Sequence, residues 1–115
     1  ASDVAGGHTA AMNRSVAGAA ALSKLNWLSH PEQRHLKVTE AFHLATRASG
    51  AFFGKVGCFE PGFDFDALVL TPDPMDSLLE RTPVERLEQF LYDGDDRHIA
   101  ARYCGGARVE RPFAL

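Results

Sequence analysis

The stretch TPVERLEQFLYDGDDRHIAARYCGGARV, residues 82–109, decides the fold of the C-terminal part of the chain. It opens with a capping box, because Thr82 can cap a helix and Glu85 can bond back to the amide of the capping residue. Pro83 suits the first helical position. The pattern predicts a helix that runs to about Tyr92 and stops at Gly94. Its buried side is expected to consist of Val84, Leu87 and Leu91.

The rest of this stretch predicts a β-hairpin. Residues 99–104 and 107–109 are short strand candidates, and Gly105-Gly106 between them supplies the positive φ that a two-residue hairpin turn needs. Residues 67–70, with the sequence ALVL, have the length and composition of a third, buried strand. The polar run between helix and hairpin, residues 95–98, is expected to form a turn.

Two helices are predicted nearer the N-terminus. The first spans about residues 10–28 and ends at Ser29-His30-Pro31, because proline disfavours helix for the residue before it. Its apolar residues at helical spacing are Met12, Val16, Ala19, Ala20 and Leu25. The second spans residues 34–48, and its apolar stripe is Val38, Ala41, Phe42, Ala45 and Ala48. Helices followed by short strands and one more helix define an α+β chain.

Composition excludes several classes of protein. The chain has 115 residues, 45% of them hydrophobic and 23% charged, which is typical of a globular domain and not of a disordered one. A net charge of −3 gives no reason to expect nucleic acid or an anionic membrane as a partner. No apolar run is long enough to span a bilayer. Cys58 and Cys104 form no C-x-x-C pair, so we expect reduced thiols and a cytoplasmic location.

Three blocks, taken in order, resemble the end of a guanine deaminase of the amidohydrolase superfamily. The first is SDVAGG, residues 2–7, and the second is VGCFEPGFDFDALVL, residues 56–70. The third is FLYDGDDRHI, residues 90–99, followed by YCGGARV, residues 103–109. The resemblance implies that residues 1–53 are the end of a (β/α)8 TIM barrel, with the loop after its last strand. It implies that residues 54–115 are part of a flanking β-sandwich.

The resemblance also implies a chemistry. Such enzymes bind one zinc and hydrolyse guanine to xanthine and ammonia, and Asp3 matches the catalytic aspartate that binds their metal. Zinc lowers the pKa of a bound water, and a carboxylate beside that water can orient it and accept its proton. Because a catalytic zinc needs three or more protein ligands, we expect the isolated chain to hold no zinc and to be inactive.

Other polar residues favour ordinary roles. The five histidines, His8, His30, His35, His43 and His98, show no H-x-H or H-x3-H spacing. Of these, only His8 follows the Gly6-Gly7 turn and could border an active-site mouth. The acidic run 93–96 lacks the glutamate of a calcium loop, so we expect a turn in which Arg97 is a local ion partner.

Two alternatives remain open from the sequence. The chain could come from another amidohydrolase acting on a purine, pyrimidine or triazine ring, because residues that read the substrate lie outside it. It could also be a stand-alone assembly domain without catalysis. If the isolated chain folds on its own, its helices expose apolar faces that the lost barrel strands normally cover, and we expect a dimer or a larger assembly.

Overall fold

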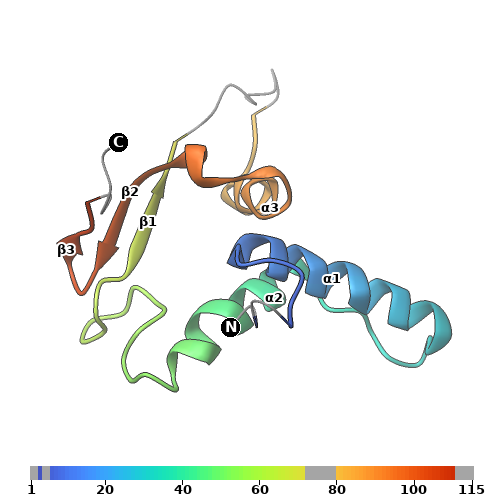
Figure 1. Cartoon of the computed structure of the whole chain (residues 1–115). Helices are drawn as coiled ribbons and strands as arrows, with labels where there is room; N and C mark the ends of the chain where they lie inside the picture. The colour runs from blue at the N-terminus through green and yellow to red at the C-terminus, as the bar shows by residue number, and fades with distance from the viewer. Residues whose placement is uncertain (1–2, 4–5, 72–79, 111–115) are drawn as a thin grey trace.

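The computed structural model describes residue 3, residues 6–71 and residues 80–110. Three α-helices and a small sheet account for its regular structure (Figure 1). The elements follow one another as α1 (Met12–Ser29), α2 (Val38–His43), the π-helix η1 (Leu44–Ala48), β1 (Ala67–Leu70), α3 (Pro83–Asp93), the 3-10 turn η2 (Asp96–His98), β2 (Ile99–Cys104) and β3 (Ala107–Arg108). The predicted α+β class is therefore confirmed.

The C-terminal elements form as their local signals predict. The Thr82 hydroxyl accepts a hydrogen bond from the amide of Glu85, and the Glu85 carboxylate accepts one from the amide of Thr82 at 2.7 Å. β2 and β3 are joined by Gly105 and Gly106, whose φ angles are +55° and +80°. Both turn residues thus lie in the left-handed region that favours glycine.

The sheet has the antiparallel order β1-β2-β3. Ala67 is opposite Tyr103, and Tyr103 is opposite Arg108, so β2 is the central strand. The carboxylate of Asp66 accepts a hydrogen bond from the amide of Gly105 at 2.7 Å, which ties the start of β1 to the hairpin turn. This contact joins residues that are far apart in the sequence.

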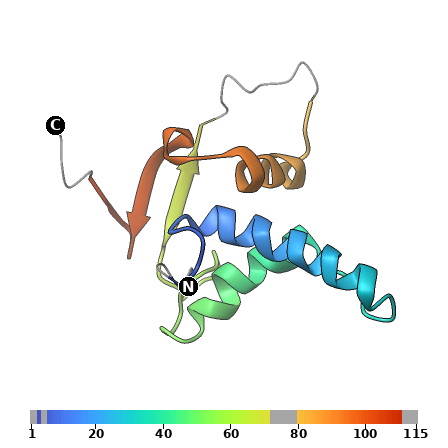
Figure 2. The same cartoon turned by 45° about the vertical axis from the view of Figure 1, so that its right-hand side comes forward.

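The helices pack together on one side of the sheet, with α1 beside α2 and α3 next to α1 (Figures 1 and 2). Val16, Ala41 and Leu91 are the buried residues of this cluster, one from each helix. Partly buried side chains packed against them are Leu36, Val38, Phe42, Ala45 and Leu87. The core therefore joins residues from both of the predicted parts, 1–53 and 54–115. The division itself stays a prediction.

The predicted start of the second helix was wrong. The second helix begins at Val38 and not at residue 34, because Lys37 is extended and its amide donates to the Glu40 carboxylate at 2.9 Å. Arg34 also binds Glu40, through two hydrogen bonds of 2.8 and 2.7 Å, and so lies ahead of the helix.

β1, predicted to be a buried strand, exposes Leu68 and Val69, because a strand of this small sheet is not covered on both faces. Among the helical residues expected in the core, Met12, Ala19, Leu25, Ala48 and Val84 are exposed. Spacing predicted a helix for each of them, but it did not determine which face of that helix the neighbouring elements cover. In the described part of the chain no helix is both long and apolar enough to cross a membrane.

Candidate functional site

The first candidate is the turn that begins at Asp3. Asp3 has a φ of +50°, an uncommon value for a residue with a side chain. Its carbonyl oxygen accepts hydrogen bonds from the amides of Gly6, at 2.9 Å, and Gly7. The turn is therefore closed by its own backbone and leads directly towards α1. Residues 2, 4 and 5 of the same sequence block lie outside the described residues.

The carboxylate of Asp3 lies over Gly6. A Cβ atom built on Gly6 would be 2.5 Å from Oδ2 of Asp3 and 3.1 Å from its Cγ. Only a residue without a side chain allows the carboxylate to fold back over the turn in this way. Asp3 is exposed, and its side chain makes no hydrogen bond or ion pair to the described residues. Its oxygens are therefore accessible to a ligand.

His8 lies beyond this turn, against the outside of α1. A Cβ built on Gly18 would be 3.4 Å from Cε1 of the His8 ring, which is ordinary van der Waals contact. The ring itself is exposed. The described contacts hold His8 on the helix and do not join it to Asp3, so a role at an active-site mouth stays a prediction.

The second aspartate turn, at residues 95–98, has a different character. The Asp95 carboxylate accepts hydrogen bonds from the backbone amide of Arg97 at 3.0 Å and from its guanidinium at 2.7 Å. His98 Nδ1 lies 3.1 Å from the same carboxylate. The hydrogen bonds from Arg97, as the main cause, hold the pKa of Asp95 well below its ordinary value. The expectation of a turn with Arg97 as local ion partner is confirmed.

The side chains that could bind a metal ion are those of His, Cys, Asp and Glu. Among the described residues, no three His, Cys, Asp or Glu side chains lie close enough to hold a metal ion together. His98 is hydrogen-bonded within its own turn. A zinc site that uses Asp3 would need its remaining ligands from outside the described residues.

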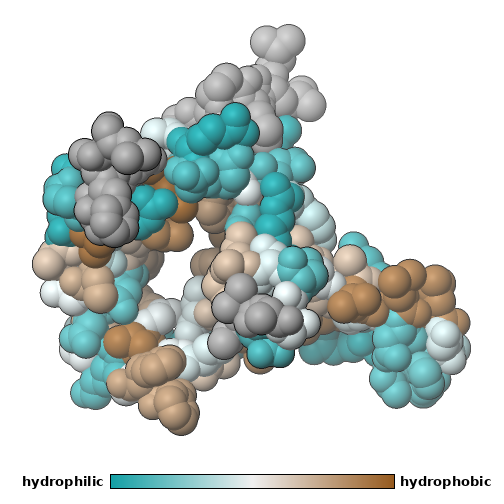
Figure 3. Space-filling model, viewed as in Figure 1, coloured by the Kyte–Doolittle hydropathy of each residue, from teal (hydrophilic) through white to brown (hydrophobic). Residues whose placement is uncertain are grey.

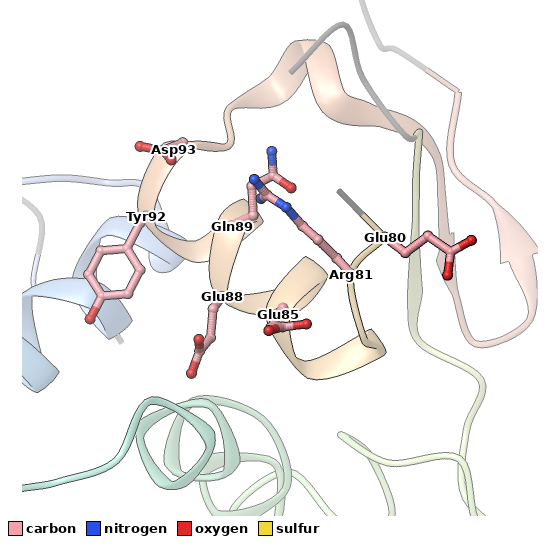
Figure 4. A pocket seen from close by; sticks show the side chains of 7 residues that line it. All are labelled: Glu80, Arg81, Glu85, Glu88, Gln89, Tyr92 and Asp93. Atoms are coloured by element: carbon pink, nitrogen blue, oxygen red, sulfur yellow. The ribbon is translucent and has the colours of Figure 1, made fainter. Parts of the chain in front are cut away.

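Sequence reasoning did not find a shallow pocket of about 490 Å³ along α3. Its lining is Glu80, Arg81, Glu85, Glu88, Gln89, Tyr92 and Asp93. Glu80 and Arg81 precede α3, the other lining residues lie along it, and the side chains do not converge on one point (Figure 4). One of them, Glu85, is already used to cap α3. The pocket therefore offers no convergent set of catalytic groups.

Curated relatives with similar sequences are guanine deaminases. The chain is 33% identical to the guanine deaminase of Rattus norvegicus and 32% identical to that of Homo sapiens, over 97% of this chain and 27% of each relative. It is 27% identical to the protein of the same name from Dictyostelium discoideum. The chain thus spans about a quarter of the length of these relatives. No protein-family model matches it.

Solved structures give the same result. The guanine deaminase of C. acetobutylicum, crystallised with guanine bound in its active site, superposes with a TM-score of 0.85 and 42% identity. That match covers 95% of this chain and 26% of the other. The E. coli guanine deaminase matches with a TM-score of 0.76 and 28% identity, again over 26% of its length.

Sequence and fold therefore agree on the class: the chain is homologous to part of a deaminase. More specifically, it is a homologue of guanine deaminases that matches about a quarter of their length. The resemblance found in the sequence blocks is confirmed.

Proposed function

We propose that this chain is the C-terminal part of a zinc-dependent guanine deaminase, which converts guanine and water to xanthine and ammonia. The observation that carries the proposal is the superposition on the C. acetobutylicum enzyme, whose crystals hold guanine in the active site. A TM-score of 0.85 over 95% of the chain supports the same arrangement of α1, α2, α3 and the sheet in both proteins. In the longer protein, residues 1–53 would complete a (β/α)8 barrel and residues 54–115 would join a β-sandwich.

Asp3 is the residue that we assign to the chemistry. Catalytic residues of (β/α)8 enzymes lie in the loops after the barrel strands, and Asp3 lies in a loop that leads into a helix. Zinc, when bound, would lower the pKa of a water molecule towards neutrality. The accessible carboxylate of Asp3 would contribute one ligand and accept a proton from that water.

Asp3 is the one ligand that we assign to the proposed metal site, and no group of three His, Cys, Asp or Glu side chains among the described residues could hold a metal ion. Three or more protein ligands are usual for catalytic zinc, so we propose that the chain by itself neither binds zinc tightly nor deaminates guanine. The free thiols of Cys58 and Cys104 support a reducing, cytoplasmic compartment for the longer protein.

One experiment separates this function from its two alternatives. The full-length protein that contains the chain is purified with zinc, and ammonia release is measured with guanine and with other aminated purines, pyrimidines and triazines. We expect guanine to have the highest kcat/KM by at least ~10²-fold, because a site built to bond one ring leaves polar groups unpaired with another.

Each other outcome of this assay indicates a different class of protein. Preference for another ring would identify a different amidohydrolase and would overturn the guanine assignment. Absence of deamination with every ring, in a folded protein of full length, would favour a domain for assembly. The 115-residue chain is assayed alongside, and appreciable turnover by it would contradict the single-ligand argument.

A further inference from the structure

Helix α1 begins without a cap of its own. Ala11 at its N-cap position gives no side-chain hydrogen bond to the helix, and the first turn holds no acidic residue. Such groups usually satisfy the free amides at the start of a helix and so fix where it begins. The start of α1 lies next to α3 instead, and the two helices are in contact (Figures 1 and 2). We therefore looked to α3 for the contacts that hold this end of α1.

Two side chains in the first turn of α1 bind the last carbonyl groups of α3. The side-chain amide of Asn13 donates to the carbonyl oxygen of Gly94 at 2.7 Å and makes a longer contact, 3.5 Å, with that of Phe90. The guanidinium of Arg14 donates to the carbonyl oxygen of Tyr92. Gly94 is buried, and a buried carbonyl group needs a hydrogen-bond partner. These bonds thus satisfy the end of α3 and fix the start of α1 at the same time.

The first turn of α1 follows directly on the segment that carries Asp3. In this segment the carbonyl oxygen of Asp3 accepts hydrogen bonds from the amides of Gly6 and Gly7. The amide of Ala11 donates to the hydroxyl of Thr9 at 3.0 Å. Both sets of bonds lie within the segment, so they shape it but do not fix it relative to α3. The first turn of α1 is the nearest point at which the described side chains bind α3.

We infer that Asn13 is a positioning residue of the proposed deaminase: it anchors the start of α1 to the end of α3 and thereby holds the Asp3 carboxylate in place. This role rests on the proposed function, because Asn13 acts only through Asp3 and touches no reacting atom. Arg14 assists from an exposed position. A displacement of a reacting group on the order of 1 Å can lower a rate about 10²-fold, so one hydrogen bond beside the site can determine kcat.

The far end of α1 supplies a matched control. There the side-chain amide of Asn26 donates to the side chain of Gln33 at 3.2 Å. Leu25 and Leu28 are exposed at this end, and hydrophobic surface gathers over it (Figure 3). Asn26 thus has the same donor on the same helix, but it joins α1 to the loop that follows the helix and not to α3. If an asparagine amide acts only through the stability of α1, Asn13 and Asn26 should respond alike to substitution.

The first measurement is steady-state kinetics of the full-length protein with guanine. Asn13→Ala should lower kcat about 10-fold and change KM by less than about 3-fold, because a displaced Asp3 slows the chemical step more than it weakens substrate binding. Asn13→Gln keeps an amide donor and should restore most of the lost kcat. Asn26→Ala should leave kcat and KM unchanged. Thr82→Ala removes the cap at the other end of α3, and it should lower thermal stability while leaving kcat within about 2-fold.

The second measurement does not depend on activity. Hydrogen exchange of the Gly6 and Gly7 amides, which close the Asp3 turn, is followed by mass spectrometry of the full-length protein. Asn13→Ala should raise their exchange rate about 5-fold, which corresponds to the loss of one ordinary hydrogen bond, and Asn26→Ala should leave it unchanged. Should Asn13→Ala not fold, Arg14→Ala takes its place and should change kcat and exchange in the same direction by a smaller factor.

The two measurements separate this role of Asn13 from the proposed function. A wild-type protein that does not deaminate guanine refutes the proposed function, and the exchange of Gly6 and Gly7 then decides whether Asn13 holds the Asp3 turn. An active deaminase in which Asn13→Ala, or Arg14→Ala in its place, leaves both kcat and exchange unchanged overturns the inference. An equal fall of kcat in Asn13→Ala and Thr82→Ala also overturns it, because helix stability alone would then explain the loss.

Discussion

Two turns of this molecule each place an aspartate beside a glycine, and they differ in what surrounds the carboxylate. Asp95 is bonded by the amide and guanidinium of Arg97 and contacts His98. Asp3 folds over Gly6 and offers its oxygens to solvent. The Asp95 carboxylate is used to build its turn, whereas the Asp3 turn is closed by backbone hydrogen bonds alone.

This difference distinguishes a carboxylate with a structural role from a carboxylate that is available for chemistry. A carboxylate that is saturated by local donors stabilises the link between α3 and β2, but it has little left for a metal or a water molecule. A carboxylate that is accessible on a closed turn can bind either without loss of the turn. Three predictions test or refine this contrast, from the largest expected effect to the smallest.

The largest effect is expected for Asp3→Asn in the full-length protein. The amide keeps the shape but cannot accept a proton, so kcat/KM for guanine should fall by about 10²- to 10⁴-fold. Steady-state kinetics at saturating zinc measure this. Asp95→Asn is the matched control and should lower thermal stability while leaving kcat/KM within about 2-fold, the usual context dependence of a substitution remote from the chemistry. Equal losses of activity in both variants would remove the contrast between the turns.

The next prediction compares Gly→Ala in the two turns. At Gly6 the new Cβ would meet the end of the Asp3 side chain at 2.5 Å, which can move away, so the fold should survive while the carboxylate is displaced. We expect kcat/KM of the full-length enzyme to fall by about 10- to 100-fold, the cost of a misplacement on the order of 1 Å.

At Gly94 the new Cβ would clash with the ring and the carbonyl oxygen of Phe90, and this backbone cannot move without distorting α3. Overpacking of this kind should destabilise the fold by about 1–3 kcal/mol. Urea unfolding of the full-length protein measures it, and the surviving folded fraction should keep its kcat/KM. A Gly6→Ala variant that is destabilised as much as Gly94→Ala would show that both turns are mainly structural.

The smallest expected effect is a loss of stability at acidic pH. The Arg34 hydrogen bond lowers the pKa of Glu40 from 4.5 to about 2, and the pKa of Asp95 is lowered by Arg97. Because both values are depressed in the folded state, their contribution is present above their ordinary pKa and is lost as pH falls through the folded value. Thermal melts should therefore shift to lower temperature between pH 4.5 and about 2.

Variants check the assignment of this acid effect. Glu40→Gln should flatten the pH dependence and lower stability at neutral pH, although Glu40 and Asp95 are both partly exposed and screening by solvent keeps the changes small. Carboxyl chemical shifts of Asp95 should titrate below the ordinary value for aspartate. An unchanged pH dependence in Glu40→Gln would show that the Arg34 contact does not stabilise the fold.

Much of the local structure could be predicted from residue patterns. The capping box at Thr82 and Glu85 and the Gly105-Gly106 hairpin form as predicted, because each depends on atoms only a few residues apart. Asp3 was singled out only through the resemblance to guanine deaminases, since a lone aspartate before Gly-Gly has no distinctive spacing. Its role in catalysis remains a proposal.

The predictions that failed concern which face of a helix is buried and where a helix begins. Met12, Leu25 and Val84 have helical spacing, yet they lie on sides that no described element covers. The early start predicted for the second helix failed because Glu40 bonds both Arg34 and the Lys37 amide, and the pattern of apolar residues does not report such contacts. These outcomes depend on the arrangement of whole elements.

By itself the sequence determined where helices and turns begin and end in the C-terminal part, and it identified the relatives, because local hydrogen bonds and ordered motifs are encoded in short stretches. Only the tertiary structure decided that Val16, Ala41 and Leu91 meet while Leu22, Leu25 and Leu28 do not. Burial requires a neighbour, and the neighbours of a helix face come from distant parts of a chain or from another molecule. The exposure of the outer face of α1, which carries Leu22, Leu25 and Leu28, therefore follows from the packing of the elements and not from the spacing of apolar residues.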